Sequence, residues 1–487
     1  MTAQEQSNKR QKRVKGPLIL SAATRNSATN WRNPDDRSAE FTTNIKAAVE
    51  FAQIAERGKL TNVFYVDHLS FYTYDGDYKF SAKNGINASR VDPLALISAV
   101  ALSTENIGII STASTISEHP YHFFRRLASV EHLSNNRVGW NIVSSYLETI
   151  GPNLLNGAPL PEHDERYVKT SEYLDVVYKL FLSSWREDAL KYDRPNGILA
   201  DPELIRTIDH KGKYFQVEGP ANVEPARSGI PLIVQAGTST KGIEFAAENA
   251  ELVFIATEQL SKITTIRKLA QDKFGRDPNS IKFISSLKVF VAKTHEEAEI
   301  KRTKFSEYED PEAGLAYFGG VSGFDLAKYD WDEPITLTKP SNGIRSSVKD
   351  AFHTGAKIQT KRDLAARWRN NGAIIGTPVE IADYIEKFVE DNDVDGFNLS
   401  VNNFPQSLND IVDLLIPELQ KRGLAQKEYP VPGGSLRENF YGVKGQYFVP
   451  ENHPAYKLRW KEGVSREKFE KELKEYELLR DARRATN

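Results

Sequence analysis

Short runs of β-branched and other apolar residues alternate with stretches of helical spacing along most of the chain. The apolar runs predict eight strands, at residues 18–23, 62–68, 107–114, 138–145, 230–237, 251–257, 282–292 and 396–400. The segments between them carry apolar residues at helical spacing, as in residues 41–60, where Gly58 stands near the end. Near-continuous apolar strands separated by helices are typical of a parallel sheet that is covered on both faces. Eight such units predict a (β/α)8 TIM barrel, and an open doubly wound sheet is the alternative that periodicity leaves open.

Three stretches are longer than a minimal barrel requires. We expect one barrel domain over residues 17–423, with insertions at about 146–229 and 293–375. Residues 1–16 form a basic tail that we expect to be disordered, and a C-terminal helical extension, 424–487, ends in a highly charged helix. Insertions of this size usually cap or line the site of a barrel. The second insertion is either a static cap or a moving lid with hinges at Gly314, Gly319, Gly320 and Gly323.

The composition narrows the possible partners. Lys and Arg number 64 and Asp and Glu 66, so no overall field attracts nucleic acid or a membrane surface. Cysteine is absent, which excludes disulfides, cysteine-ligated metal centres and a thiol nucleophile, and which fits a reducing compartment. The N-terminus lacks the apolar core of a signal peptide, and no apolar run reaches the roughly 18 residues that a membrane span needs. We therefore expect a cytoplasmic protein whose partners include neither nucleic acid nor a membrane.

Several motifs that identify a reaction are absent from the sequence. There is no G-x-x-x-x-G-K-[ST] and no strand-linked G-x-G-x-x-G, so we expect neither a P-loop nor a built-in nicotinamide fold. G-x-S-x-G and H-E-x-x-H are also missing. His119 and His122 come nearest to a metal-binding spacing, but a metal barrel needs several His and Asp at different strand ends, and the first strand has none. We expect no metal, and a chain without an obvious nucleophile depends on a cofactor for its difficult chemistry.

The stretch PEHDERYVKT (161–170) contains a first candidate site. His163 and Tyr167 are four residues apart, which places them on one face near the start of a predicted helix. A helix N-terminus offers free N–H groups and the positive end of a dipole, so a phosphate there would gain donors from backbone, imidazole and phenol. A plain helix start explains the same residues, because the acids of this stretch also suit a helix N-terminus.

The stretch VQAGTSTKG (234–242) contains a second candidate site, because it follows a predicted strand and opens a predicted helix. Its small residues at the strand-to-helix turn are Gly237, Thr238, Ser239 and Gly242. Exposed backbone N–H groups, an added hydroxyl and little side-chain bulk are the features of a phosphate cradle. In barrels the phosphate often lies on the late βα loops. An ordinary capped turn is the alternative for this stretch taken alone.

A series of ordered motifs runs from about residue 18 to about residue 450. It includes DHLSFY (67–72), TASTISEHPYHFFRRLASVEHLS (112–134), RVGWNIVSS (137–145), EHDERYVKTSEYLDVVYKLF (162–181), PLIVQAGTSTKGIEFAAENAE (231–251) and DGFNLS (395–400). With these motifs the chain resembles the bacterial luciferase-like flavin monooxygenases. The resemblance is to the branch that contains nitrilotriacetate, dibenzothiophene-sulfone and long-chain alkane monooxygenases. It implies a (β/α)8 barrel that holds FMN at the carboxyl ends of its strands.

The resemblance also implies a set of FMN-binding residues, carried over position by position. The matching residues are Asp67 after the second strand, Thr112 in TAST, Ser145 after WNIV, His163 and Tyr167 in HDERY, and Ser239 in QAGTS. In the family, His163, Tyr167 and Ser239 match phosphate contacts. The resemblance therefore favours the phosphate interpretation of both candidate sites, to which Gly237 and Thr238 also belong.

The chain departs from the alkane enzyme of that branch near the expected substrate. Tyr146 and Tyr317 stand where the alkane enzyme has histidines, and Tyr72 matches a tyrosine that lines its substrate side. These three tyrosines are the candidate catalytic residues. Tyrosine has a pKa of about 10 and histidine of about 6.5, so the exchange removes a base that works near neutrality. It leaves a neutral donor on a large apolar ring, which predicts a flat or moderately polar organic substrate in place of a bare alkane.

The mechanism that the resemblance implies needs a second protein. A separate NAD(P)H:flavin reductase supplies reduced FMN, which reacts with O2 to a C4a-(hydro)peroxyflavin that oxidises a small organic substrate. We expect a homodimer or homotetramer. Two other classes stay open: a non-catalytic flavin-binding protein of the same fold and a metal-dependent barrel hydrolase.

Overall fold

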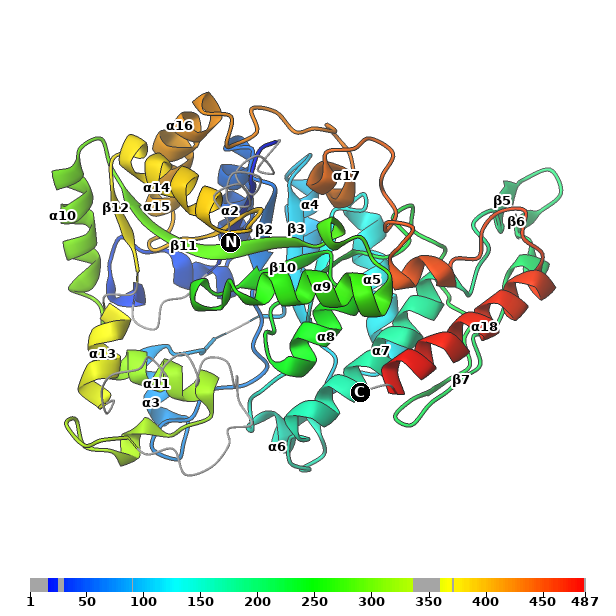
Figure 1. Ribbon diagram of the computed structural model, residues 1–487, viewed down its shortest axis with the longest axis horizontal. Coiled ribbons are helices and arrows are strands. Elements are labelled where there is room, and N and C mark those ends of the chain that lie inside the picture. Colours follow the sequence, from blue (N-terminus) through cyan, green and yellow to red (C-terminus); the bar gives the residue numbers. More distant parts are fainter. Residues whose placement is uncertain (1–15, 25–29, 90, 336–359, 370–371, 486–487) are drawn as a thin grey trace, which may run out of the picture.

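Eight parallel strands close into a barrel at the centre of the protein (Figure 1). The computed structural model describes residues 16–24, 30–89, 91–335, 360–369 and 372–485. Each barrel strand pairs in parallel with the next one along the chain, and the last pairs back with the first. This closure confirms the predicted TIM barrel and excludes the open sheet. The strands are β1 (Ile19–Ala23), β2 (Asn62–Tyr65), β3 (Gly108–Ser114), β4 (Val138–Val143), β9 (Leu232–Gln235), β10 (Leu252–Ile255), β11 (Lys282–Val291) and β13 (Gly396–Ser400).

The predicted strands begin close to the observed ones, but several of them run too far at the carboxyl end. β2 ends at Tyr65, β4 at Val143 and β9 at Gln235, two or three residues before the apolar pattern stops. At Ser145 the backbone has already turned into the left-handed region, with φ 63°. The apolar residues beyond these ends belong to loops above the barrel, which periodicity cannot separate from strands.

Helices alternate with the strands and cover the outside of the barrel (Figure 1). In α2, the buried face includes Phe51 and Ala55, and the side chain of Asn44 caps the first turn by accepting a hydrogen bond from the backbone N–H of Lys46. The long helices of this layer are α2 (Ile45–Arg57), α4 (Leu94–Leu102), α5 (Pro120–Leu133), α7 (His163–Leu182), α8 (Thr240–Asn249), α9 (Lys262–Phe274) and α14 (Pro378–Asp391). Shorter helices are α3 (Lys79–Asn84), α6 (Ile150–Leu154), α15 (Gln406–Asp410) and α16 (Ile416–Lys421).

Helix α17 (Leu436–Tyr441) closes the amino end of the barrel. Leu436 packs so tightly against the first residue of β3 that a Cβ on Gly108 would lie 2.2 Å from its Cδ1. Beside it, Arg437 forms a fully buried ion pair with Glu251, at 2.8 Å. Because this end is filled, the opposite, carboxyl end is the one that is available for a ligand.

The first insertion supplies one regular barrel helix and two small hairpins. Although the sequence places α7 inside this insertion, the helix packs between α5 and α8 as part of the outer layer. The hairpins are β5 (Leu190–Asp193) with β6 (Ile198–Ala200) and β7 (His210–Lys211) with β8 (Gln216–Val217). The C-terminal α18 (Arg466–Ala485) is joined to α7 by ion pairs of Asp175 with Arg480 and Arg484, at 3.0 and 2.7 Å.

The second insertion packs over the carboxyl end of the barrel. It contains α10 (His295–Ser306), α11 (Pro311–Ser322), α13 (Lys361–Arg369) and β12 (Ile374–Gly376), which pairs with the end of β11. Leu315 and Ala316 of α11 join a second apolar cluster with residues of the loops after β2 and β4. Residues 336–359 of this insertion, and most of the predicted N-terminal tail, lie outside the described residues. The proposed domain boundaries stay a prediction.

The four glycines proposed as hinges lie in α11 or directly after it. Gly314, Gly319 and Gly320 lie inside α11, and Gly323 ends this helix in the left-handed conformation, with φ 78°. A Cβ on Gly320 would lie 2.2 Å from the ring of Tyr72. Gly320 therefore packs closely and Gly323 ends the helix, and movement of the segment on these glycines stays a prediction. None of the helices in the described ranges is both long enough and apolar enough to cross a membrane.

Candidate functional site

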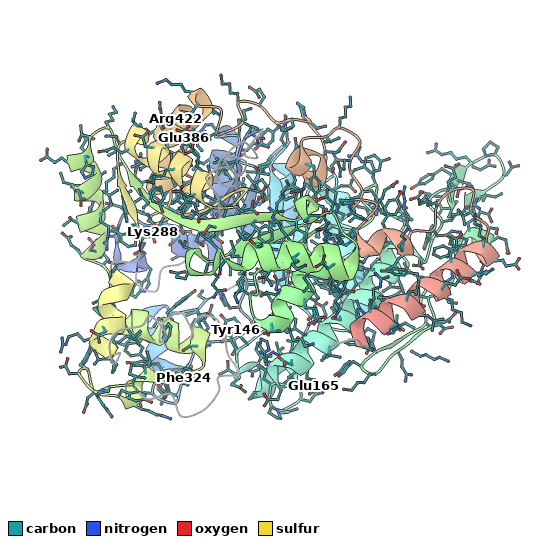
Figure 2. The ribbon with its side chains drawn as sticks, in the orientation of Figure 1. Tyr146, Glu165, Lys288, Phe324, Glu386 and Arg422 are labelled. Carbon is teal, nitrogen blue, oxygen red and sulfur yellow. The ribbon has the colours of Figure 1, made fainter. Side chains whose placement is uncertain are left out.

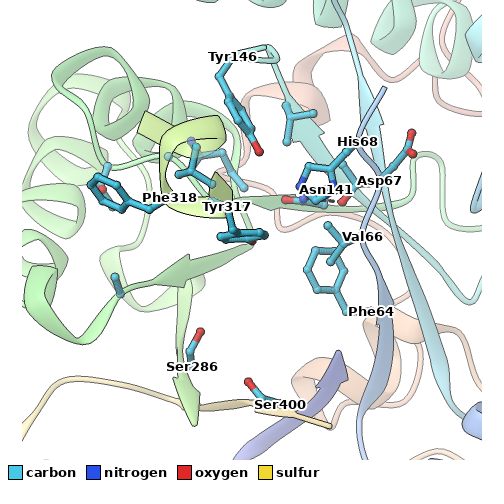
Figure 3. Close-up of a pocket in the computed structure, with 18 of the residues that line it drawn as sticks. Phe64, Val66, Asp67, His68, Asn141, Tyr146, Ser286, Tyr317, Phe318 and Ser400 are labelled. Carbon is cyan, nitrogen blue, oxygen red and sulfur yellow. Dashed lines mark hydrogen bonds between the residues drawn. The ribbon is translucent and has the colours of Figure 1, made fainter. Parts of the chain in front are cut away.

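A large cavity lies at the carboxyl ends of the barrel strands (Figure 3). Its volume is about 1180 Å³, and its wall combines strand ends from around the barrel with parts of both insertions. The structure brings ten of the eleven predicted site residues into this wall: Asp67, Thr112, Ser145, Tyr146, His163, Tyr167, Gly237, Thr238, Ser239 and Tyr317. Their functional roles stay a prediction, but one cavity collects them from distant parts of the sequence.

The turn between β9 and α8 forms one end of the cavity. Ser239 is the N-cap of α8, and its hydroxyl accepts a hydrogen bond from the backbone N–H of Gly242 at 3.1 Å. A Cβ on Gly237 would lie 2.5 Å from the hydroxyl of Tyr167, and a Cβ on Gly242 would lie 2.9 Å from the carbonyl oxygen of Gly237. Only glycine therefore allows the turn and the tyrosine hydroxyl to approach this closely.

The first turn of α7 faces the same end of the cavity. His163 begins this helix, and its Nδ1 lies 2.6 Å from a carboxylate oxygen of Asp164, which fixes the ring. The rings of His163 and Tyr167 are 5.2 Å apart. Arg166, only 1% exposed, donates a hydrogen bond to the carbonyl oxygen of Pro161 at 2.7 Å. This turn thus adds a buried positive charge to the imidazole and phenol that the sequence predicted.

We call the turn at residues 237–242 and the first turn of α7 the anion cradle. Burial raises the pKa of the Tyr167 hydroxyl, which therefore stays a neutral hydrogen-bond donor at physiological pH, although hydrogen bonds to Ser239 and Gln235 act in the opposite direction. The N-terminus of α8 adds backbone N–H groups and a positive dipole end. A phosphate matches this set of donors and charges.

The wall beside the anion cradle is polar and buried. The amide of Asn141 on β4 donates to the hydroxyl of Thr112 at 3.0 Å, and the hydroxyls of Ser114 and Ser145 are 2.7 Å apart. Within the described part of the chain, the side-chain oxygens of Asn141 and Gln235 are buried without a hydrogen-bond partner. A buried acceptor without a partner costs free energy. The N–H and carbonyl groups of a flavin ring are chemically suited to such a wall.

Aromatic residues form the far wall of the cavity. Tyr146 and Tyr317 line it, whereas Tyr72 is fully buried behind them and shares a hydrogen bond between hydroxyls with Tyr146 at 2.5 Å. The ring of Tyr72 also meets that of Tyr317 edge-on at 5.5 Å. His68 stands edge-on to Tyr72 and Tyr146, and Figure 3 shows it beside Asp67 and Asn141. Tyr72 can therefore act on a bound ligand only through its neighbours.

Sequence reasoning missed several polar residues of the cavity, namely Arg166, His68, Asn141, Gln235 and Lys288. Two of them left a signal that could have been used. Arg166 lies three residues after His163, on the same face of the predicted helix. Lys288 is a charged residue inside a predicted strand, two positions after Ser286 and therefore on the same face. In the described residues, no group of three or more His, Cys, Asp or Glu side chains could hold a metal ion.

Comparisons with known proteins identify close relatives of this chain. Residues 23–393 match the family described as luciferase-like monooxygenase. The long-chain alkane monooxygenase of Geobacillus thermodenitrificans is 37% identical over 434 residues, which cover 88% of this chain and 94% of the relative. Component A of the nitrilotriacetate monooxygenase of Aminobacter aminovorans is 34% identical, with 84% of this chain and 92% of the relative covered.

A solved structure extends the similarity to a flavin complex. A riboflavin lyase, crystallised with modified FMN and its substrate riboflavin, superposes with a TM-score of 0.83 at 31% sequence identity. The superposition covers 91% of this chain and 99% of the lyase.

Proposed function

The chain belongs to the luciferase-like monooxygenase family, as a flavin-dependent oxidoreductase, and we propose that it binds FMN and uses O2 to oxygenate a small organic substrate. The anion cradle carries this proposal, because its helix N-terminus, buried Arg166 and the hydroxyls of Tyr167 and Ser239 suit a phosphate. Riboflavin without its phosphate would leave these groups without a ligand.

In this proposal, different residues of the cavity bind different parts of the cofactor and the substrate. His163, Tyr167 and Ser239 hold the phosphate, and Asp67, Thr112 and Ser145 lie along the ring system of the cofactor. When bound, the reduced flavin supplies the chemistry that activates O2. We call the part of the cavity wall that Tyr146 and Tyr317 form the tyrosine wall. This wall and the second insertion exclude water, and the hydroxyl of Tyr146, hydrogen-bonded to Tyr72, holds a proton beside the substrate.

We propose that reduced FMN comes from a separate NAD(P)H:flavin reductase. The chain lacks a dinucleotide fingerprint, and its nitrilotriacetate relative is named as one component of an enzyme. The pure chain should therefore not oxidise NADH or NADPH at an enzymatic rate, and addition of a flavin reductase should start O2 consumption. Rapid NADH turnover by the chain alone would overturn this two-component proposal. We also propose a homodimer or homotetramer.

One experiment separates an oxygenase from a non-catalytic flavin-binding protein. Apo-protein is titrated with oxidised and with reduced FMN under anaerobic conditions, and O2 is then added together with a panel of organic substrates. An oxygenase of this type should bind reduced FMN more tightly and yield an oxygenated product. Equal affinity for both forms, with hydrogen peroxide as the sole product, would favour the non-catalytic alternative.

A further inference from the structure

A short segment at the end of β3 contacts two elements of the cavity wall at once. We call residues 114–116 the connecting segment; it comprises the last residue of β3 and the first two of the following loop. The two elements are the loop after β4 and the first half of α7, which Tyr146 and Glu165 mark in Figure 2. Thr115 is not part of the cavity wall that the described residues form. It can therefore act on a bound ligand only through its neighbours.

Two side chains of α7 hold the connecting segment. The hydroxyls of Thr115 and Thr170 are 2.7 Å apart, and both residues are buried. The ammonium group of Lys169 donates a hydrogen bond to the carbonyl oxygen of Ile116 at 2.7 Å. Thr170 lies three residues after Tyr167, which is less than one helical turn. The segment is thus fixed to α7 directly beside the anion cradle.

The same segment holds the carboxyl end of β4. The backbone N–H of Thr115 donates to the carbonyl oxygen of Val143, the last residue of β4, at 3.0 Å. The hydroxyl of Thr115 donates to the same oxygen at 3.4 Å, so that the hydroxyl of Thr170 is the donor between the two threonines. The hydroxyl of Ser114 meets that of Ser145 at 2.7 Å. Val143 and Ser145 are therefore both held by the connecting segment.

The backbone turn at Ser145 determines the direction of Tyr146. Ser145 has a φ of 63°, in the left-handed region, which costs free energy for a residue with a Cβ. Such a conformation persists only where the surrounding structure holds it. The next residue is Tyr146, which packs with Tyr72 against the apolar cluster that includes Ile116. A shift of the turn would therefore move the hydroxyl of Tyr146 away from that of Tyr72.

We propose that Thr115 is a positioning residue of the oxygenase. Its hydroxyl fixes the end of β4 against α7 and thereby holds the hydroxyl of Tyr146 at its place in the tyrosine wall. This inference rests on the proposed function, because the part that Tyr146 plays beside the substrate belongs to that proposal. Thr115 itself donates no proton to the reaction and contacts no ligand.

The test compares variants that differ in the hydroxyl alone. Thr115→Val keeps nearly the same shape and removes the hydroxyl, whereas Thr115→Ser keeps the hydroxyl. Thr104→Val is the matched control, since Thr104 is also buried and its hydroxyl donates to the carbonyl oxygen of Val100 at the end of α4. Each variant carries a fluorinated tyrosine at position 146, whose fluorine NMR resonance in the apo-protein reports the surroundings of this ring.

Thr115→Val should shift or broaden the fluorine resonance, whereas Thr115→Ser and Thr104→Val should leave it at its wild-type position. The same variants without the fluorine label are then loaded with reduced FMN and given O2 and a substrate of the panel above. Thr115→Val should lower the ratio of oxygenated product to hydrogen peroxide by about two- to tenfold, as expected for the loss of one hydrogen bond, and Thr115→Ser should restore it. The affinity for FMN should stay within about threefold of wild type, because Thr115 is not part of the anion cradle.

The outcomes separate this inference from the proposed function. A resonance that Thr115→Val leaves unchanged, or that Thr104→Val changes equally, would overturn the positioning role, as would a change that Thr115→Ser fails to reverse. Loss of the fold in Thr115→Val would show a structural role alone and would overturn it too. The NMR measurement needs neither FMN nor substrate. A wild-type chain that binds no FMN would therefore overturn the proposed function, while the resonance still decides whether Thr115 positions Tyr146.

Discussion

The two ends of the barrel differ in how their interior is filled. At the amino end, α17 fills the interior, and Arg437 satisfies Glu251 with two hydrogen bonds at 2.8 Å while also donating to backbone carbonyls. At the carboxyl end, Gly237 allows the hydroxyl of Tyr167 to approach the turn before α8, and the side-chain oxygens of Asn141 and Gln235 lack hydrogen-bond partners in the described part of the chain. The amino end is filled by side chains, and the carboxyl end holds a cavity whose described wall includes unpaired acceptors.

The difference predicts where a substitution affects stability and where it affects binding. Groups at the amino end contribute to the free energy of unfolding, since a buried charge that loses its partner has no water to replace it. Polar groups at the carboxyl end are placed to bind a ligand and contribute little to folding. Substitution of these groups should therefore change ligand affinity more than the free energy of unfolding.

The largest effect is expected for Arg437→Met at the amino end. The substitution leaves Glu251 as a buried charge without its partner, which should lower the free energy of unfolding by about 3–5 kcal/mol. Urea unfolding measures this change. Arg362→Met is the matched control, since its ion pair with Asp332 is exposed and its loss should change the free energy of unfolding far less. Equal losses in the two variants would contradict the contrast between the ends.

A second effect at the amino end depends on pH. Burial raises the pKa of the Glu131 carboxyl to about 7 from 4.5, so its contribution to stability is present below pH 4.5 and is lost as the pH rises through about 7. Glu131→Gln mimics the protonated form at every pH. The variant should exceed wild type in free energy of unfolding at pH 8 by on the order of 1–3 kcal/mol. The difference should shrink towards pH 4.5, and a difference independent of pH would show that Glu131 is ionised throughout.

Features that depend on short segments could be predicted from the sequence. The eight strands follow from apolar runs, and most of the anion cradle from two segments of ten residues or fewer, 161–170 and 234–242. Arg166 within the first of these was missed because an arginine on a helix is usually a surface residue. Its burial depends on packing that no local pattern encodes.

The tyrosine end of the cavity was harder to predict, because it needs contacts between distant segments. The sequence could not show that Tyr72 lies behind Tyr146, since the loop after β2 and the loop after β4 meet only in the folded barrel. Nor could it show that Gly320 packs on Tyr72. Periodicity reports which face of an element is buried, not which element covers it.

At the carboxyl end, we expect the larger effect in the anion cradle. Ser239→Ala combined with Tyr167→Phe removes two donors, each worth roughly 1.5–3 kcal/mol towards a charged group, and should weaken FMN binding at least about tenfold. The unfolding transition should move little. An unchanged dissociation constant for FMN would show that the phosphate lies elsewhere.

A smaller effect is expected at the tyrosine wall. Tyr146→Phe and Tyr317→Phe should change FMN affinity by less than about threefold, because neither hydroxyl belongs to the cradle. Loss of a hydrogen-bond donor beside the substrate should lower the ratio of oxygenated product to hydrogen peroxide by about three- to tenfold. If both variants lose FMN while this ratio stays normal, the two tyrosines belong to the cofactor site.

The central claim is that the carboxyl end recognises a phosphate, and riboflavin tests it most directly because it differs from FMN by that group alone. Fluorescence titration of the wild-type chain with the two molecules gives both dissociation constants under identical conditions. With Arg166, His163, Tyr167, Ser239 and the N-terminus of α8 around the phosphate, we predict that FMN binds at least about a hundredfold more tightly. Equal affinities for FMN and riboflavin would contradict the account.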